Sequence, residues 1–334
     1  MASDNTPGAP SLVDGGGRRV EYLRISVTDR CNLKCAYCMP AGGSHFTPDC
    51  DMVRFTDLLR LTRLFARLGV RKIRITGGEP LVRKGVTRFI HQAATIPGIE
   101  RVALTTNGLS LGRMAAGLRK AGVTSVNISL DTLRRDRYAT ITGHDGLDNA
   151  MKGITSALEA GFDSVKINTV LMAGVNDDEI AAIARLTMTM PVQTRFIEFM
   201  PATAGVWNPS HFISAEEAKK RIEETFGPLA PVERERWSGP ARIFRFPDAV
   251  GEVGFISSVS SHYCGACNRL RITSKGELLT CLFGAERLNL RALIMQGATD
   301  DDIIAAIRGA LERKNHVRDF DAAGSRQVMS SIGG

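Results

Sequence analysis

Apolar, β-branched runs alternate with amphipathic stretches along this sequence up to about residue 227. Strand-like runs fall at residues 22–27, 72–76, 102–105, 125–130, 165–171 and 195–199. Helical patterns fall at residues 56–68, 86–95, 111–121, 147–160, 177–189 and 214–226. Such alternation predicts an α/β fold with parallel strands and crossover helices, in a doubly wound sheet or a partial TIM-type barrel. Both architectures place ligand-binding groups at the carboxyl ends of the strands.

The pattern changes after residue 227, where short strand candidates at 232–234, 242–246, 253–256 and 269–273 precede a helix at 301–313. We expect a partial-barrel domain over 19–227, a C-terminal, mainly β domain over 228–320 and a tail over 321–334. Residues 1–18 are rich in Gly, Pro, Asp and Ser and lack the apolar segment of a secretion signal, so a disordered tail is expected there. No run of about 18 apolar residues occurs, which disfavours a membrane-spanning helix.

Seven cysteines indicate metal binding or catalysis, because we expect a cytoplasmic protein, in which thiols stay reduced. The first group is Cys31, Cys35 and Cys38, three thiols that can converge on one centre from a single loop. A structural zinc site needs a fourth ligand, such as His45. A four-iron cluster on three cysteines instead leaves one iron open to a small chelating molecule. Buried inert thiols are the third alternative.

The second group, Cys264, Cys267 and Cys281, has the same missing fourth ligand. A zinc site completed by His262 is an equal alternative at this point. Cys50 is left over and is interpreted as a plain thiol. The formal charge of +8 favours anionic partners: nucleic acid, phosphate esters or an acidic surface.

The first group, with Tyr37 before its last cysteine, resembles the C-x3-C-x-aromatic-C signature of the radical S-adenosylmethionine (SAM) enzymes. The two triplets together resemble, more narrowly, the GTP 3′,8-cyclase family of molybdenum cofactor biosynthesis. The similar pieces are Ser-Val-Thr-Asp-Arg-Cys-Asn (26–32), Lys-Ile-Arg-Ile-Thr-Gly-Gly-Glu-Pro (72–80), Leu-Thr-Thr-Asn-Gly-Leu (104–109), Asn-Ile-Ser-Leu-Asp (127–131), Arg-Phe-Ile-Glu-Phe-Met (195–200) and Cys-Asn-Arg-Leu-Arg (267–271).

The resemblance implies a partial (β/α)6 barrel whose C-terminal extension carries a second [4Fe–4S] cluster. It implies a lyase in which the first cluster reductively cleaves SAM, and the resulting 5′-deoxyadenosyl radical takes the 3′ hydrogen of GTP. The C3′ radical then attacks C8 of guanine, giving 3′,8-cyclo-7,8-dihydro-GTP, while the second cluster holds the guanine end. This is the first step of molybdenum cofactor biosynthesis.

The site residues that the resemblance implies fall into sets. The first cluster is assigned to Cys31, Cys35 and Cys38, and the second to Cys264, Cys267 and Cys281. SAM is assigned to Tyr37, Gly78, Glu79, Ser129 and Met200, and GTP to Arg24, Arg74, Thr105, Lys166, Arg269 and Arg271. Arg24, Arg269 and Arg271 are expected to be catalytic as well, and Gly333 and Gly334 are expected to reach back into the site.

Independent arguments support part of this assignment. Arg24, Arg74 and Lys166 lie in predicted parallel strands, so their side chains can enter one cavity and hold a triphosphate. Arg269 and Arg271 share a strand face beside Cys267. Glu79 follows a glycine pair and can pair with an ammonium group. No G-x-x-x-x-G-K-[ST] loop occurs, so GTP binding of the P-loop kind is not expected.

The expected partners are GTP as substrate, an electron donor of the flavodoxin or ferredoxin type, and cyclic pyranopterin monophosphate synthase as functional successor. Homodimer formation is an open prediction, and neither nucleic acid nor a membrane is expected as a partner. A radical SAM enzyme that has an auxiliary cluster and acts on a peptide or another substrate is one alternative. A zinc-stabilised nucleic-acid-binding protein is another, although aromatic residues make up only 6% of the chain.

Overall fold

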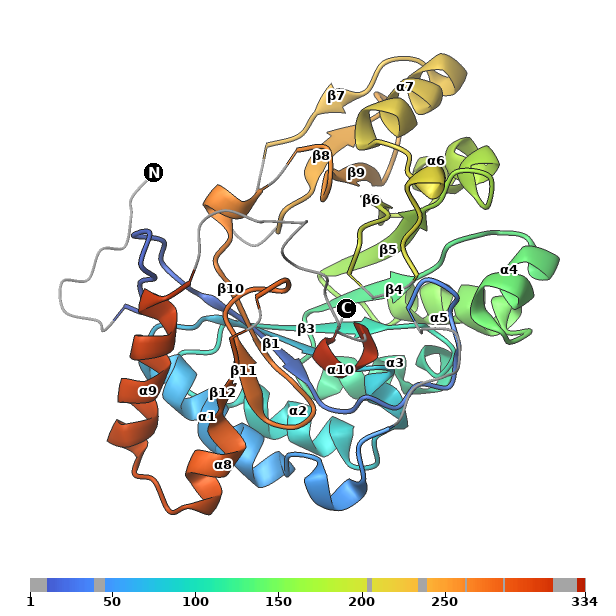
Figure 1. Ribbon diagram of the computed structural model, residues 1–334. Coiled ribbons are helices and arrows are strands. Elements are labelled where there is room, and N and C mark those ends of the chain that lie inside the picture. The colour runs from blue at the N-terminus through green and yellow to red at the C-terminus, as the bar shows by residue number, and fades with distance from the viewer. Residues whose placement is uncertain are drawn as a thin grey trace.

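The computed structural model describes residues 11–38, 46–202, 206–233, 239–261, 263–284, 286–314 and 329–333. Its centre is one sheet with the strand order β12-β11-β10-β1-β2-β3-β4-β5-β6-β9-β8-β7 (Figure 1). The six central strands are parallel and are β1 (Tyr22–Ser26), β2 (Lys72–Thr76), β3 (Arg101–Thr106), β4 (Ser125–Ser129), β5 (Ser164–Leu171) and β6 (Val192–Glu198). The partial-barrel prediction is confirmed, and the strands match the predicted ranges to within three residues.

Helices connect these strands and cover the outer face of the sheet, with α1, α2 and α3 gathered below the strands in Figure 1. They are α1 (Phe55–Arg67), α2 (Val86–Ala94), α3 (Leu111–Lys120), α4 (Arg135–Thr142), α5 (Leu147–Glu159), α6 (Ile180–Thr189) and α7 (Ala215–Phe226). Helix α4 was not predicted, because only Tyr138, Ile141 and Thr142 of its eight residues are buried and its apolar period is weak.

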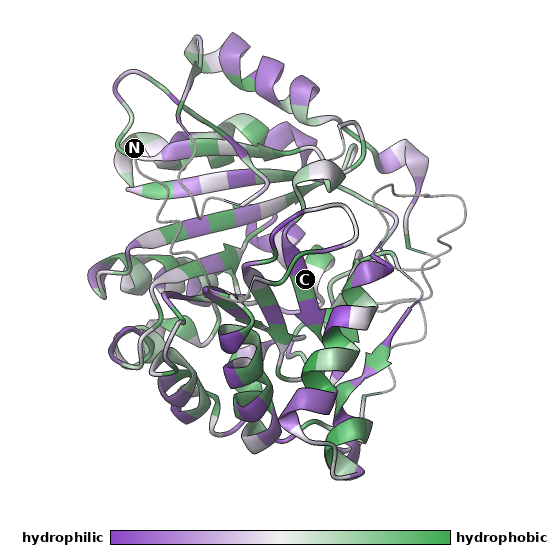
Figure 2. Cartoon of the chain, turned by 90° about the vertical axis from the view of Figure 1, so that its left-hand side faces the viewer, coloured by the Kyte–Doolittle hydropathy of each residue, from purple (hydrophilic) through white to green (hydrophobic). Residues whose placement is uncertain are grey.

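Alternation along each strand separates a polar inner face from an apolar outer face. On β1, Leu23 and Ile25 are fully buried in the main hydrophobic core, and Arg24 lies between them on the opposite face. The strands in Figure 2 are therefore banded green and purple. This alternation directs cations into the barrel while the aliphatic side chains pack against the helices.

The C-terminal part extends the same sheet at both of its edges. Strand β9 (Glu252–Ile256) pairs parallel with β6, and β10 (Arg269–Ile272) pairs parallel with β1. The antiparallel strands beyond them are β7 (Ala230–Pro231), β8 (Arg242–Arg245), β11 (Glu277–Leu279) and β12 (Leu288–Asn289). Three helices follow: α8 (Leu290–Met295), α9 (Asp300–Glu312) and α10 (Met329–Ile332). A mainly β extension was expected, but its strand directions and the two parallel pairings were not predicted.

Residues 11–18 pack against the rest of the chain, whereas a disordered tail was expected there. Leu12 is 2% exposed, and its N–H donates to the Leu68 carbonyl at 2.9 Å. Val13 forms an antiparallel bridge with Arg19. The apolar Leu12 anchors this segment in the core, despite the glycines that follow it. Residues 1–10 and 315–328 lie outside the described part of the chain. In the part that the structure describes, no helix is long and apolar enough to cross a bilayer.

Candidate active site

A cavity of about 260 Å³ runs through the inside of the partial barrel, from Tyr22 and Lys72 at the starts of β1 and β2 to the loops after the carboxyl ends of the central strands. Its lining includes the first cysteine triplet and most of the predicted ligand-binding residues. Those predicted residues are Cys31, Cys35, Cys38, Arg24, Tyr37, Arg74, Gly78, Thr105, Ser129, Met200, Arg269 and Arg271. Residues that were not predicted also line it, among them Tyr22, Lys72, Asn127, Asn168 and Arg195. Tyr22, Lys72 and Asn168 each lie two residues from a predicted site residue, so the period of two would have found them.

Strand register brings the arginines together. Arg24 on β1 stands between Arg271 on β10 and Arg74 on β2, since the register aligns it with both. Neighbouring strands are about 4.8 Å apart, so these three guanidinium groups share one small region. All three are buried or nearly so, and within the described residues none of them has a carboxylate within 4.0 Å. An anion is the ligand that would satisfy such a cluster.

Tyr22 lies between two more cations, because the register places it beside Arg269 and Lys72. The Lys72 Nζ lies 4.9 Å from the centre of the Tyr22 ring, and the Tyr22 hydroxyl accepts a hydrogen bond from Arg74 Nε. Burial raises the pKa of Tyr22, but the surrounding positive charges outweigh burial and hold that pKa well below its ordinary value. The net effect shows how positive this wall of the cavity is.

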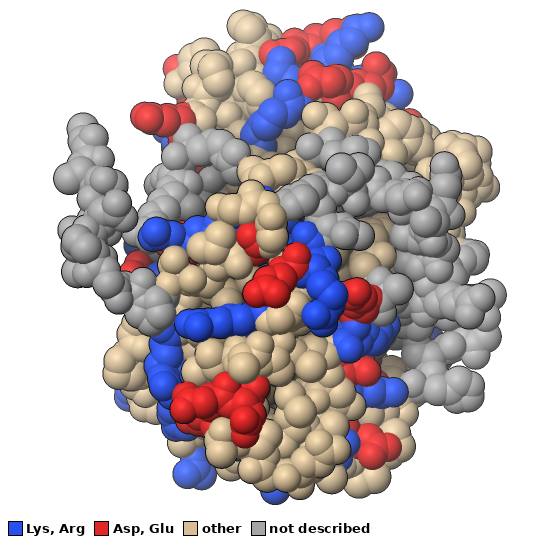
Figure 3. All heavy atoms as spheres, turned by 60° about the vertical axis from the view of Figure 1, so that its left-hand side comes forward, with Lys and Arg blue, Asp and Glu red and all other residues tan. Residues whose placement is uncertain are grey.

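Lys166 lines a second cavity, of about 340 Å³, rather than the first. Lys72 and Arg195 line both cavities, so the basic interior runs from one cavity into the other. Burial, followed by Arg195, Arg74 and Lys72, lowers the pKa of Lys166 to about 6. Part of the net positive charge of the chain therefore belongs to side chains inside the protein. On the surface shown in Figure 3, acidic and basic side chains are mixed.

The first cysteine triplet lines the cavity with three free thiols. Burial raises the pKa of Cys35 and Cys38, the latter to about 12. Such thiols become ligands only beside a positive centre. Within the described residues, no three His, Cys, Asp or Glu side chains are placed to share one metal ion. A [4Fe–4S] cluster fits this donor set better than zinc, because each thiolate then binds a different iron. His45 lies outside the described residues.

Two polar atoms in the cavity wall fit a bound nucleotide or nucleoside. The side-chain oxygens of Asn127 and Asn168 are buried and have no hydrogen-bond partner among the described residues. A buried acceptor without a donor is unfavourable, so each is suited to a ligand N–H or O–H.

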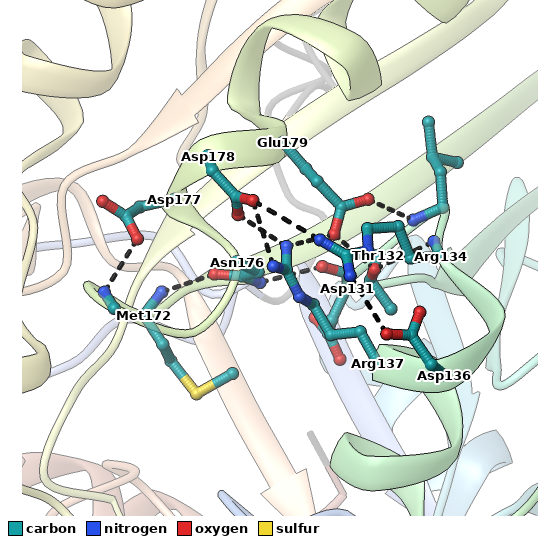
Figure 4. Close-up of polar contacts among 12 residues, drawn as sticks. Asp131, Thr132, Arg134, Asp136, Arg137, Met172, Asn176, Asp177, Asp178 and Glu179 are labelled. Atoms are coloured by element: carbon teal, nitrogen blue, oxygen red, sulfur yellow. Dashed lines mark hydrogen bonds and ion pairs between the residues drawn. The ribbon is translucent and has the colours of Figure 1, made fainter.

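Tyr37 connects the cysteine loop to strand β5 through Asp131. Its hydroxyl donates to Asp131 Oδ2 at 2.8 Å, and the Val170 N–H donates to Asp131 Oδ1 at 2.8 Å. Burial raises the pKa of Asp131 to about 6. Figure 4 shows the contacts behind it, where Asn176 donates to the Asp131 carbonyl at 2.8 Å and Glu179 accepts from Thr132. Asp131 was not predicted as a site residue, although it lines the cavity.

The glycine pair after β2 permits close backbone contact. A Cβ at Gly77 would lie 2.5 Å from the Thr28 carbonyl oxygen, and one at Gly78 would lie 2.4 Å from that of Arg30. Glu79 is not among the residues that line the cavity. Its carboxylate accepts from the Asn107 N–H at 2.7 Å, the Thr106 hydroxyl at 2.8 Å and the Leu81 N–H at 3.0 Å. The structure thus differs from the expectation that Glu79 faces a ligand ammonium group.

The second triplet lies beside the arginines of β10. Cys264 begins a short 3-10 turn, in which the Cys267 N–H donates to the Cys264 carbonyl at 3.1 Å. Cys281 follows β11, and Leu282 next to it lines the cavity. Burial raises the pKa of Cys267, but Arg269 and Lys314 outweigh burial and bring it to about 7. His262 lies outside the described residues, and Cys50 is exposed.

The C-terminus reaches the cavity. Met329 and Ser330 of α10 line it, and the Gly333 carbonyl accepts from Arg271 Nη1 at 3.4 Å. Gly333 has a φ of 72°, and a Cβ on it would lie 2.2 Å from Thr76 Cγ2. The left-handed φ and the close approach to Thr76 both favour glycine at this position. Gly334 lies outside the described residues.

Comparison with known proteins gives consistent results. Residues 25–187 match the radical SAM superfamily, and residues 192–320 match the family described as Molybdenum Cofactor Synthesis C. A GTP 3′,8-cyclase of Pelotomaculum thermopropionicum is 46% identical over 95% of this chain and 98% of its own length. Molybdenum cofactor biosynthesis protein 1 of Homo sapiens is 41% identical over 92% of this chain and 48% of its own length. Among solved structures, Streptococcus suis SuiB shares the fold, with a TM-score of 0.61, 16% identity, and coverage of 88% of this chain and 69% of its own.

Proposed function

Because the chain belongs to the GTP 3′,8-cyclase family of radical SAM enzymes, we propose that its basic cavity binds GTP and cyclises it. The reaction is the family's step in molybdenum cofactor biosynthesis. The observation that carries the proposal for this cavity is the row of Arg271, Arg24 and Arg74, three cations without a carboxylate partner among the described residues, beside two cysteine triplets. Family membership removes the alternative of a zinc-stabilised nucleic-acid-binding protein.

We assign the two [4Fe–4S] clusters to the two triplets: Cys31, Cys35 and Cys38 hold the first, and Cys264, Cys267 and Cys281 hold the second. When bound, the clusters and SAM supply the electron and the hydrogen-abstracting radical that the cyclisation requires. Tyr37, Gly78, Ser129 and Met200, which line the cavity, are the proposed SAM contacts. Gly78 offers its backbone, since no side chain fits there.

The triphosphate is proposed to lie along the inner face of β1, β2 and β10. Arg24, Arg74 and Arg271 bind phosphate oxygens, and Arg269 beside Cys267 directs the base toward the second triplet. The arginine row excludes a neutral or cationic substrate, because several buried cations would remain unpaired. Lys166 binds the far end of the triphosphate, in the second cavity that shares Lys72 and Arg195 with the first. Thr105, which accepts from Arg74 at 3.0 Å, orients that arginine.

We further propose a cytoplasmic location and an electron donor of the flavodoxin or ferredoxin type, since the clusters need a reducing compartment. The product would pass to cyclic pyranopterin monophosphate synthase. Gly333 and Gly334 are assigned to the closing of the cavity, and homodimer formation stays a prediction.

Anaerobic reconstitution tests the assignment of the clusters. We expect about eight irons per chain, which is four for each three-cysteine site. Stoichiometric zinc without iron would overturn the assignment. With reductant and SAM, addition of GTP should yield 5′-deoxyadenosine and a cyclised nucleotide.

The variant Arg24→Gln should weaken GTP binding about 30-fold, because one charge-assisted contact is lost at about 2 kcal/mol. Arg63→Gln, on the exposed side of α1, is the matched control and should bind GTP normally. SAM cleavage that never responds to GTP would instead support a peptide or another substrate.

A further inference from the structure

Three charged side chains from distant parts of the chain meet behind the second cysteine triplet. Asp14 belongs to the N-terminal segment, Arg18 follows it by four residues, and Lys314 follows helix α9. Asp14 Oδ2 lies 2.8 Å from Arg18 Nε and 3.5 Å from Lys314 Nζ. The side chains of Asp14 and Lys314 are 0% and 2% exposed. We call these three residues the buried ion triad.

Both cations of the triad also donate hydrogen bonds to the loop that carries Cys264 and Cys267. Arg18 Nη1 donates to the carbonyl oxygen of Cys264 at 2.5 Å. Lys314 Nζ donates to the carbonyl of Cys267 at 3.2 Å and to that of Arg269 at 3.3 Å. One carboxylate therefore holds two cations, and each cation holds the backbone of one proposed cluster ligand.

The triad is itself held rigidly. Asp14 Oδ1 accepts from the N–H groups of Gly16 at 3.1 Å and Arg18 at 3.0 Å. Gly15 donates to the Leu311 carbonyl at 3.2 Å, and a Cβ on Gly15 would lie 2.4 Å from the Glu312 carbonyl oxygen. The N-terminal segment is thus seated against the end of α9, so Asp14 meets Lys314 in one arrangement.

Burial of three charges is not explained by stability alone. Desolvation of an ion pair often outweighs its attraction, so apolar side chains would fill this space at least as well. The triad carries one net positive charge, and it faces thiols that become negative as ligands. Arg18 Nη2 is also buried without a hydrogen-bond partner among the described residues, which leaves a donor for an acceptor at this loop.

We propose that the buried ion triad positions the second cysteine triplet for its cluster and offsets part of the negative charge of that cluster. Asp14, Arg18 and Lys314 are positioning residues, since they act through the carbonyl groups of Cys264 and Cys267. The inference rests on the proposed function, because that proposal places a cluster at this triplet.

The test uses the full chain with Cys31, Cys35 and Cys38 replaced by Ser, so that only the second site holds iron. Asp14→Asn and Lys314→Met should each release iron to a chelator about tenfold faster, as loss of a supporting contact around a metal site does. Lys314→Arg keeps the charge and should restore slow release. Asp300→Asn is the matched control, because Asp300 pairs with Arg60 at 2.8 Å at the other end of α9, and it should leave release unchanged.

The midpoint potential of this cluster separates charge from shape. Asp14→Asn removes a negative charge and should raise the potential, whereas Lys314→Met removes a positive charge and should lower it. A merely structural role would move both potentials in the same direction. Iron release and potentials equal to those of the unaltered triad would overturn the inference. Absence of iron at Cys264, Cys267 and Cys281 in the parent chain would instead overturn the proposed function.

Discussion

Replacement of Gly333 by Ala tests whether the C-terminal segment belongs to the active site. Gly333 combines a φ of 72° with a position where a Cβ would lie 2.2 Å from Thr76 Cγ2. Real Cβ atoms do not approach a methyl carbon so closely, so either α10 must move away or Thr76 must shift. Thr76 lies at the buried end of β2, which leaves the tail as the part that moves.

The free-energy cost of Gly333→Ala to the docked tail has two parts. The left-handed backbone conformation costs an L-residue about 1 kcal/mol. Overpacking against Thr76 costs about 2 kcal/mol more. Together, about 3 kcal/mol lowers the ratio of docked to undocked tail about 150-fold.

Hydrogen exchange of residues 329–333 measures that ratio, and the rate of GTP turnover at low GTP measures its consequence. Gly174→Ala is the matched control, because Gly174 has the same φ of 72° but a Cβ added to it would have no atom within 4 Å. It should cost only the backbone part, about 1 kcal/mol of global stability.

A second substitution, at Thr76, separates the cost of the steric clash from the cost of the backbone conformation. Thr76→Ser removes Cγ2, after which the nearest remaining contact of the new Cβ is the residue 76 hydroxyl oxygen, at 3.2 Å in the parent chain. The double variant should therefore regain most of the tail protection that the steric part removes. Unchanged protection of residues 329–333 in Gly333→Ala would refute the reasoning.

Three further outcomes are expected. Because the pKa of Lys166 is lowered to about 6, the unliganded fold loses stability as pH falls from about 10 toward 6, where the unfolded chain takes up a proton that the folded chain does not. Calorimetry in buffers of different ionisation enthalpy should show proton uptake on GTP binding near pH 7.5. Lys166→Met should remove most of this uptake and leave the smaller share of Lys72, whose pKa is lowered to about 8. Glu79→Gln should lower the free energy of unfolding, measured in urea, by about 2 kcal/mol, because an amide nitrogen cannot accept from the Asn107 N–H. A large loss of SAM affinity without loss of stability would contradict the placement of Glu79. Tyr37→Phe should lower the melting temperature of the iron-free chain, since the buried Asp131 carboxylate loses the hydroxyl that donates to it at 2.8 Å. An unchanged melting temperature would argue against that contact.

The sequence predicted the parallel core because its signal is local. Six β-branched runs separated by amphipathic helices leave few alternatives, and the turns after β1 and β2 carry the recognisable motifs. The pairing of β10 with β1 is different in kind. It joins Arg271 to Arg24 across a separation of more than two hundred residues, and no periodicity reports which edge a late strand will choose.

The site residues also divide into those that have a local sequence signal and those that have none. Arg24, Arg74, Arg269 and Arg271 were assigned from the family resemblance, and strand position and spacing supported the assignment. Glu79 was assigned to a ligand because the sequence does not reveal two of its internal donors, Thr106 and Asn107, which lie at the end of β3 and just after it. Asp14 was placed in a disordered tail because composition does not show that Leu12 would enter the core.

The two parallel edge pairings have a consequence for how the protein is made. Strands β9 and β10, which cover the free edges of β6 and β1, are translated only after all six central strands. At roughly 5–20 residues per second, the nascent chain spends several seconds with both flanks of its sheet open to unwanted pairing. Cys264 and Cys267 emerge just before β10, and Cys281 and the tail emerge later still. We therefore expect iron to be inserted after release from the ribosome, and chains truncated before residue 252 to aggregate or bind chaperones where the full-length chain does not.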